Sequence, residues 1–160
     1  MKILKWPSGA LKVVCEPVDI ASDKEYLDQL LEMSQLADSM GGVGLAANQV
    51  GLTKRMLIAR TQDSWRNFVN PVLIVPNDSY VSNMTEGCLS LPGVQMTVRR
   101  PLSVIVTHDT PEGPRTDRVA GLLAQILQHE VEHLDGKTLA DRLTPSARDQ
   151  LRAKIRRGAW

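Results

Sequence analysis

Residues 129–133 read His-Glu-Val-Glu-His, and this stretch decides how the chain folds and what it can do. It lies in the segment 119–134, which is apolar almost throughout and therefore predicts a helix buried on most sides. Side chains four residues apart share one face of a helix, so His129 and His133 are placed to bind one metal ion. Glu130 beside them is a candidate general base for metal-assisted hydrolysis of an amide-like bond.

The two histidines supply only two ligands, so the third has to come from elsewhere in the chain. Metalloproteases with this motif take it from a downstream Glu or His, but neither residue type occurs after His133. His108 comes at the end of a predicted strand, where we expect a surface histidine. Cys88 lies in an irregular segment, 86–93, between two strand patterns, and a thiolate there would complete a Cys-His-His site with a fourth position open to water. The alternative for a single cysteine is a small buried hydrophobe, which we expect of Cys15.

The composition favours an ordinary globular protein. The 160 residues fit one domain, 1–160, with 42% hydrophobic and 23% charged residues. A net charge of +1 gives no general attraction to DNA or to a membrane surface. Two cysteines suit a reducing compartment, and no stretch is as long as a membrane span, so we expect a cytoplasmic protein.

Helix and strand patterns alternate along the rest of the chain. Ser22 and Glu25 form a capping-box pattern before a predicted amphipathic helix over 23–39. A glycine-rich apolar segment, 42–51, follows. Strands are predicted at 55–59, 72–75, 94–98 and 102–106, with a turn at 109–114. A basic helix over 145–157, with Pro145 at its first position, ends the pattern.

Three segments together resemble the signature motifs of the peptide deformylase family. They are Gly-Val-Gly-Leu-Ala-Ala-Asn-Gln (42–49), Glu-Gly-Cys-Leu-Ser (86–90) and Gln-His-Glu-Val-Glu-His-Leu-Asp-Gly (128–136). The resemblance implies an α+β fold in which antiparallel β-sheets pack around a central buried helix that carries HExxH, with a C-terminal helix. It implies a monomeric hydrolase that removes the formyl group from N-formyl-methionyl nascent peptides and releases formate. One divalent metal ion is implied, Fe(II) in the cell, with zinc, nickel or cobalt as substitutes.

The resemblance also assigns roles to individual residues. Cys88, His129 and His133 are the implied metal ligands, and Glu130 the implied base and proton shuttle. The Gln49 amide and the Leu89 backbone N–H are the implied donors to the formyl oxygen. Val43, Leu122 and Ile126 are implied to line the pocket for the methionine side chain. Gly44 and Gly87 are implied to pair with the peptide through their backbone. Glu86 and Arg100 are the implied pair that supports the Cys88 loop.

Plainer roles remain open for several of these positions. The glycines also fit a tight turn, and the three apolar residues also fit simple core packing. The segment 60–70 is short for the family, and position 125 is Gln where some relatives have an aliphatic residue, so the pocket is expected to be more polar or more open. The basic C-terminal helix, which in bacterial relatives docks on the ribosome, also fits a solvated charged face.

Two other functions remain as alternatives. One is an HExxH metallopeptidase, which the lack of a downstream third ligand argues against. The other is a non-catalytic metal- or peptide-binding module on the same fold, although Gln49, Cys88 and Glu130 are all present.

Overall fold

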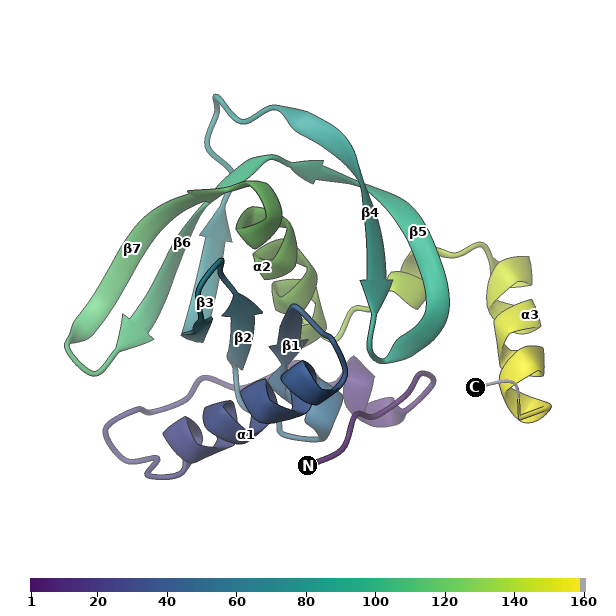
Figure 1. Ribbon diagram of the computed structural model, residues 1–160, viewed down its shortest axis with the longest axis horizontal. Helices are drawn as coiled ribbons and strands as arrows, with labels where there is room; N and C mark the ends of the chain where they lie inside the picture. The colour runs from purple at the N-terminus through teal and green to yellow at the C-terminus, as the bar shows by residue number, and fades with distance from the viewer. Residues whose placement is uncertain (159–160) are drawn as a thin grey trace.

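Two antiparallel sheets form the framework of the protein, whose computed structural model describes residues 1–158 (Figure 1). Strands of the larger sheet pair in the order β1-β2-β3-β6-β7. Their bounds are Gly44–Ala46, Met56–Arg60, Trp65–Ile74, Ser103–Thr110 and Gly113–Ala120. The smaller sheet is a hairpin of β4 (Val81–Cys88) and β5 (Leu91–Pro101). The prediction of a mixed fold with antiparallel sheets and helices is confirmed.

Two helices cover opposite faces of the larger sheet. In β2, Leu57 and Ala59 pack in one cluster with α2 (Gly121–Leu134), whereas Met56 and Ile58 pack in another with α1 (Tyr26–Ser39). Successive side chains of a strand point to opposite faces, so each helix buries one of the two sets of β2 side chains. This explains the uninterrupted apolar run of β2. A third cluster joins the β4–β5 hairpin to N-terminal residues and to the 3₁₀ helix η3 (Leu139–Arg142).

The start of α1 differs from the prediction. The helix begins at Tyr26, and Glu25 occupies the N-cap position without a capping hydrogen bond from its side chain. The Ser22 hydroxyl instead donates to Asp19 Oδ2 at 2.8 Å. The predicted capping box is therefore wrong, because Ser22 takes part in a local turn with Asp19 and not in the helix end.

The strands are longer and more numerous than predicted. The predicted strands 55–59, 94–98 and 102–106 fall within or beside β2, β5 and β6, but 72–75 is only the end of β3. Most of segment 60–70, expected between strands, belongs to β3 itself. The segment 86–93 is not irregular either: Cys88 ends β4, and β5 starts three residues later after a register shift between Gly87 and Cys88. Strands β1, β4 and β7 were not predicted.

The junction between β7 and α2 contains no loop. Ala120 ends the strand and Gly121, with φ +64°, is the first residue of the helix. Glycine adopts this left-handed conformation without the strain that a side chain would cause. At the other end of α2, Gly136 has φ +72° and follows the Asp135 C-cap, which confirms its predicted C′ position.

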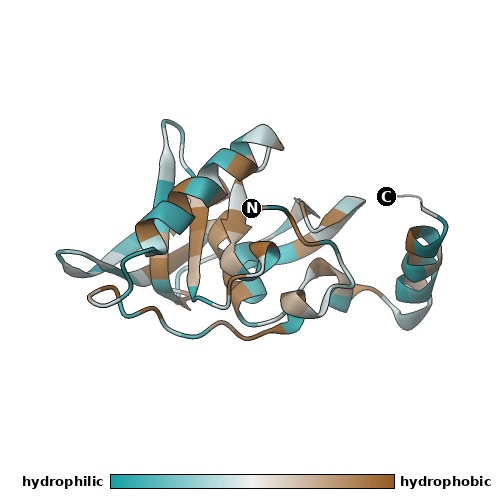
Figure 2. Ribbon diagram, turned by 90° about the horizontal axis from the view of Figure 1, so that it is seen from below, coloured by the Kyte–Doolittle hydropathy of each residue, from teal (hydrophilic) through white to brown (hydrophobic). Residues whose placement is uncertain are grey.

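Helix α3 (Pro145–Arg156) lies at one end of the molecule and is mostly hydrophilic (Figure 2). The Thr144 hydroxyl accepts a hydrogen bond from the Ala147 N–H, and Pro145 occupies the first turn, as predicted. Leu151 and Ile155 pack against the third cluster, but no residue of α3 is fully buried. Among residues 1–158, no helix combines the length and apolar character needed to cross a membrane.

Candidate metal and hydrolase site

Three potential ligand atoms converge where α2 faces the end of β4. One atom each from Cys88, His129 and His133 lies within 4.8 Å of the other two. Cys88 Sγ is 3.2 Å from His133 Nε2, and both imidazoles are buried. Burial lowers the pKa of His133 to about 3, which keeps its imidazole neutral as a ligand requires. One thiolate and two imidazoles suit a divalent first-row ion with an open fourth position, so these residues fit a metal.

A buried carboxylate orients one of the two imidazoles. Glu86 Oε2 lies 3.0 Å from His129 Nδ1, while Arg100 donates to both Glu86 oxygens at 2.8 and 2.9 Å. Burial opposes the charge, but the hydrogen bonds from Arg100 and His129 lower the pKa of Glu86 to about 2. An ionised carboxylate only accepts, so His129 Nδ1 carries the proton and Nε2 is left for a metal. The predicted Glu86–Arg100 pair is thus present.

Glu130 lies beside these ligands on α2 in a confined position. Its side chain is buried, and Oε2 has no hydrogen-bond partner within residues 1–158. Burial raises the pKa of this carboxyl to about 7. A carboxyl with this pKa accepts and returns a proton near neutral pH.

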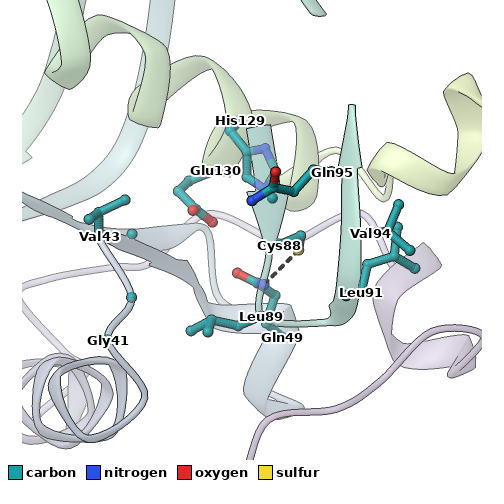
Figure 3. Close-up of a pocket in the computed structure, with 14 residues that line it drawn as sticks. Gly41, Val43, Gln49, Cys88, Leu89, Leu91, Val94, Gln95, His129 and Glu130 are labelled. Carbon is teal, nitrogen blue, oxygen red and sulfur yellow. Dashed lines mark hydrogen bonds between the residues drawn. The ribbon is translucent and has the colours of Figure 1, made fainter. Parts of the chain in front are cut away.

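Gln49 approaches the cysteine from a different element. It lies in the 3₁₀ helix η2 (Ala47–Val50), and its Oε1 accepts a hydrogen bond from Ala46 N at 2.8 Å. This contact leaves Nε2 to face Ser90 Oγ at 3.1 Å and Cys88 Sγ at 3.5 Å. Figure 3 shows Gln49, Cys88, His129 and Glu130 around one space. Ser90, which received no role in the sequence analysis, therefore helps to aim the Gln49 amide.

The N-terminal segment holds η2 against the turn between β4 and β5. Leu4 N donates to Gln49 O at 2.8 Å, and Trp6 N donates to Ser90 O at 2.9 Å. Lys5 Nζ donates to Leu89 O at 2.8 Å. These contacts place the Leu89 turn beside Gln49. Nothing in the sequence pattern of residues 4–6 indicated this support, because two of the three contacts join backbone groups and all three join distant segments.

An open groove of about 630 Å³ passes over these residues. Val43, Gly44 and Gly87 line it together with Cys88 and Leu89. A smaller cavity of about 130 Å³ opens beside it between α2 and β4, and Leu122, Gln125 and Ile126 contribute to its wall. All the predicted substrate residues therefore line one or both spaces. Val94 and Gln95 of β5 also line the groove and were missed, since the curvature that brings β5 over it is a tertiary feature.

His108 does not belong to this site. It lies within β6, is 4% exposed, and packs on Phe68 with ring centroids 4.8 Å apart. The prediction of a surface histidine was wrong because β6 continues to Thr110 and the His108 side chain is buried. Cys15 is buried in the cluster between the larger sheet and α2, as expected.

A set of nitrogen and sulfur ligands beside a buried carboxylate, in an open groove, is typical of metal-dependent hydrolases. Comparison with known proteins narrows this class. A family model described as polypeptide deformylase matches residues 1–149. The chain belongs to this family.

Individual relatives agree with the family match. The chain is 37% identical to the peptide deformylase of Thermodesulfovibrio yellowstonii, over 98% of this chain and 96% of the relative. It is 34% identical to that of Pseudomonas aeruginosa, over 97% and 94%. Among solved structures, a peptide deformylase from Legionella pneumophila superposes with a TM-score of 0.85 at 32% identity, covering 99% of this chain and 94% of that one.

Proposed function

We infer that this chain is a hydrolase that removes the N-formyl group from newly synthesised polypeptides. Family membership supports this activity, and the reaction converts a formyl amide and water into formate and a free amine. The observation that carries the assignment of residues is the convergence of Cys88, His129 and His133 beside Glu130. The substrate group we propose is the N-terminal formyl-methionine.

In this proposal Cys88, His129 and His133 hold one divalent metal ion. When bound, such an ion lowers the pKa of water and polarises an acyl oxygen. We propose Fe(II) as the native ion, with zinc, nickel or cobalt as substitutes, because thiolate and imidazole ligands accept several first-row ions. Glu86 and Arg100 keep the His129 ring oriented for this role.

The chain's own groups carry out the proton transfer and bind the oxyanion. Glu130 takes a proton from the attacking water and returns it to the leaving amine nitrogen as the carbon–nitrogen bond breaks. The Gln49 Nε2–H and the Leu89 backbone N–H donate to the formyl oxygen while negative charge develops on it. Loss of one such donor typically costs about 2.7–4 kcal/mol of barrier. The Ala46–Gln49 hydrogen bond supports this role because it turns the amide NH₂ toward the groove.

The groove is suited to an extended peptide. Gly44 begins the edge strand β1, and Gly87 lies near the end of β4, so both offer backbone groups at the groove. We propose that the substrate main chain pairs with them as an added strand. The methionine side chain then enters the 130 Å³ cavity against Leu122, Ile126 and Val43.

Formate release tests the proposal directly. The purified chain, loaded anaerobically with Fe(II), should release one formate per formyl-Met-Ala-Ser peptide in a formate dehydrogenase assay. Glu130→Gln should lose at least about 100-fold in kcat, in the range of general acid–base catalysis. Glu112→Gln is the matched control, since Glu112 is exposed in the turn between β6 and β7. No formate from the metal-loaded wild-type chain would overturn the activity.

The two alternative functions are not favoured by the family match. An HExxH metallopeptidase would cleave casein, and this cleavage would survive Cys88→Ala. A non-catalytic binding module would retain the formylated peptide without turnover.

The wider setting is also a proposal. We propose a single catalytic domain, 1–160, with α2 as its central scaffold, acting as a monomer in the cytoplasm. Helix α3 carries Arg148, Arg152, Lys154 and Arg156 and is the surface we propose for ribosome docking. Ribosome co-sedimentation with and without residues 145–160 tests the last point.

A further inference from the structure

A row of four charged side chains connects His129 to the segment that precedes α3. Glu86 of β4 contacts His129, and Arg100 of β5 contacts Glu86. Arg100 also contacts Glu132 on α2, which in turn contacts Arg142 at the end of η3. The family roles considered above account for Glu86 and Arg100 but leave Glu132 and Arg142 without a role.

Arg100 is shared between two carboxylates. Its Nε and Nη2 donate to the two Glu86 oxygens at 2.8 and 2.9 Å. Its Nη1 and Nη2 donate to the two Glu132 oxygens at 2.6 and 3.1 Å. The guanidinium is planar and only 4% exposed, so four hydrogen bonds to two carboxylates fix both its plane and its position. The plane of the Glu86 carboxylate depends in turn on this plane.

Arg142 holds Glu132 in place from the outer side. Its Nη2 donates to Glu132 Oε1 at 2.5 Å, and the Glu132 side chain is about a quarter exposed. The 3₁₀ helix η3 is itself fixed, because Leu139 is buried and Asp141 pairs with Lys12. Two cations alternate with two anions in this row, so the buried part has no excess charge. An isolated carboxylate beside Arg100 would be freer to turn toward water.

We propose that Glu132 is a positioning residue for the metal site and that Arg142 acts through it. Glu132 orients Arg100, Arg100 orients Glu86, and Glu86 orients the His129 imidazole. The inference rests on the proposed metal site. It makes Glu132, the second acidic residue of His-Glu-Val-Glu-His, part of the support for the first histidine, although Glu132 itself binds no metal.

Metal retention tests this role without relying on turnover. Wild-type, Glu132→Gln, Arg142→Gln and the double variant are loaded with Co(II), and release to excess chelator is followed by the cobalt absorption spectrum. Glu132→Gln should release the ion about tenfold faster, at the low end of effects from groups that orient metal ligands. Arg142→Gln should release it about threefold faster, since its ion pair with Glu132 is partly exposed and therefore weaker. The double variant should match Glu132→Gln, because Arg142 acts through Glu132.

Lys12→Gln is the matched control, since it removes a 2.5 Å ion pair to the same 3₁₀ helix but touches no member of the row. Release from Lys12→Gln at the Arg142→Gln rate would overturn the inference, because general loosening of η3 would then explain the effect. Release of Co(II) from Glu132→Gln at the wild-type rate would also overturn it. If Glu132→Gln does not fold, release from Arg142→Gln at the wild-type rate would do so. A wild-type chain that binds no Co(II) would instead contradict the proposed metal site.

Discussion

Gly44 and Glu130 lie so close that no side chain fits between them. A Cβ atom built on Gly44 would stand 2.6 Å from Glu130 Oε1 and 2.6 Å from Ile126 Cγ2. The absence of a side chain in β1 thus shapes the space around the proposed catalytic carboxylate. The sequence pattern indicates either backbone pairing with the peptide or a tight turn for Gly44, and neither role involves this contact.

Gly44→Ala should therefore impair catalysis. Displacing the Glu130 carboxylate by a fraction of an ångström to one ångström should lower kcat by roughly 100-fold. Metal content should stay near one ion per chain, because the new methyl group contacts Glu130 and Ile126, not the ligands. Gly9→Ala is the control, since nothing lies within 4 Å of a Cβ at that position. Wild-type kcat in Gly44→Ala would contradict the prediction.

Gln125→Leu should change selectivity in the smaller cavity. Gln125 Nε2 donates to Thr85 O at 3.2 Å and to Glu86 Oε1 at 3.4 Å, and the residue lines the 130 Å³ cavity. If the amide exchanges its long contact with Glu86 for one in the cavity, it can donate to a polar side-chain tip, whereas leucine leaves such a tip unpaired at a cost of about 1–3 kcal/mol. The preference for formyl-methionine over formyl-methionine sulfoxide peptides, measured as a ratio of kcat/KM, should rise about tenfold.

Gln128→Leu provides the comparison for this change. Gln128 lies on the same helix, but its amide donates to Pro101 O and Ala124 O and does not line the cavity. Its variant should keep the wild-type ratio. An unchanged ratio in Gln125→Leu would show that residue 125 does not influence side-chain selection.

Oxidation should inactivate the protein at Cys88 and spare Cys15. Cys88 is half-buried in the groove, whereas burial raises the pKa of the Cys15 thiol to about 11 and keeps it inert. Peroxide should cause loss of metal and activity together, with added oxygen on the Cys88 peptide in mass spectra. Cys15→Ala should be equally sensitive. Inactivation with Cys88 still reduced would refute its role as a ligand.

His108 should make folding stability depend on pH. Burial, with a contribution from the Arg66 charge, holds the pKa of His108 below its usual 6.5. The unfolded chain therefore binds a proton that the folded chain excludes. The free energy of unfolding should fall as pH drops below about 6.5, by at most about 1.4 kcal/mol per pH unit from this group.

Urea unfolding of wild-type and His108→Leu from pH 5 to pH 7.5 isolates this contribution. The other two histidines are present in both proteins, so the difference between the proteins reports on His108. The free energy of unfolding of the wild type, relative to that of His108→Leu, should decrease from pH 7.5 to pH 5. A difference that is constant with pH would contradict the prediction, because it would mean that His108 has the same pKa in the folded and unfolded states.

The sequence was most informative where burial is most complete. Helix α2 and strand β2 have apolar residues on nearly every side, and both were located to within two residues. Strand β7 was missed because it lies at a sheet edge and its mostly exposed residues include Pro114, Arg115 and Asp117. Strand β4 was missed because only Glu86 along it is fully buried, and that residue is a charged one.

Much of the site could also be predicted, since the residues that resemble the family's motifs do line one groove. What the sequence did not predict depends on contacts between distant segments. Ser90 acquires a role only when η2 brings Gln49 beside it, and Arg142 only when η3 passes the exposed side of Glu132. No local pattern encodes either contact.

The direct passage from Ala120 into Gly121 affects how the chain tolerates insertions and deletions. An α-helix turns about 100° per residue, so one residue added at this junction would rotate His129 and His133 away from Cys88 unless the strand also shifted. One residue added at the β6–β7 turn, Thr110–Gly113, would only enlarge an exposed loop. The two ends of strand β7 thus differ sharply in evolvability: length can vary freely at the Gly113 end and hardly at all at the Ala120 end.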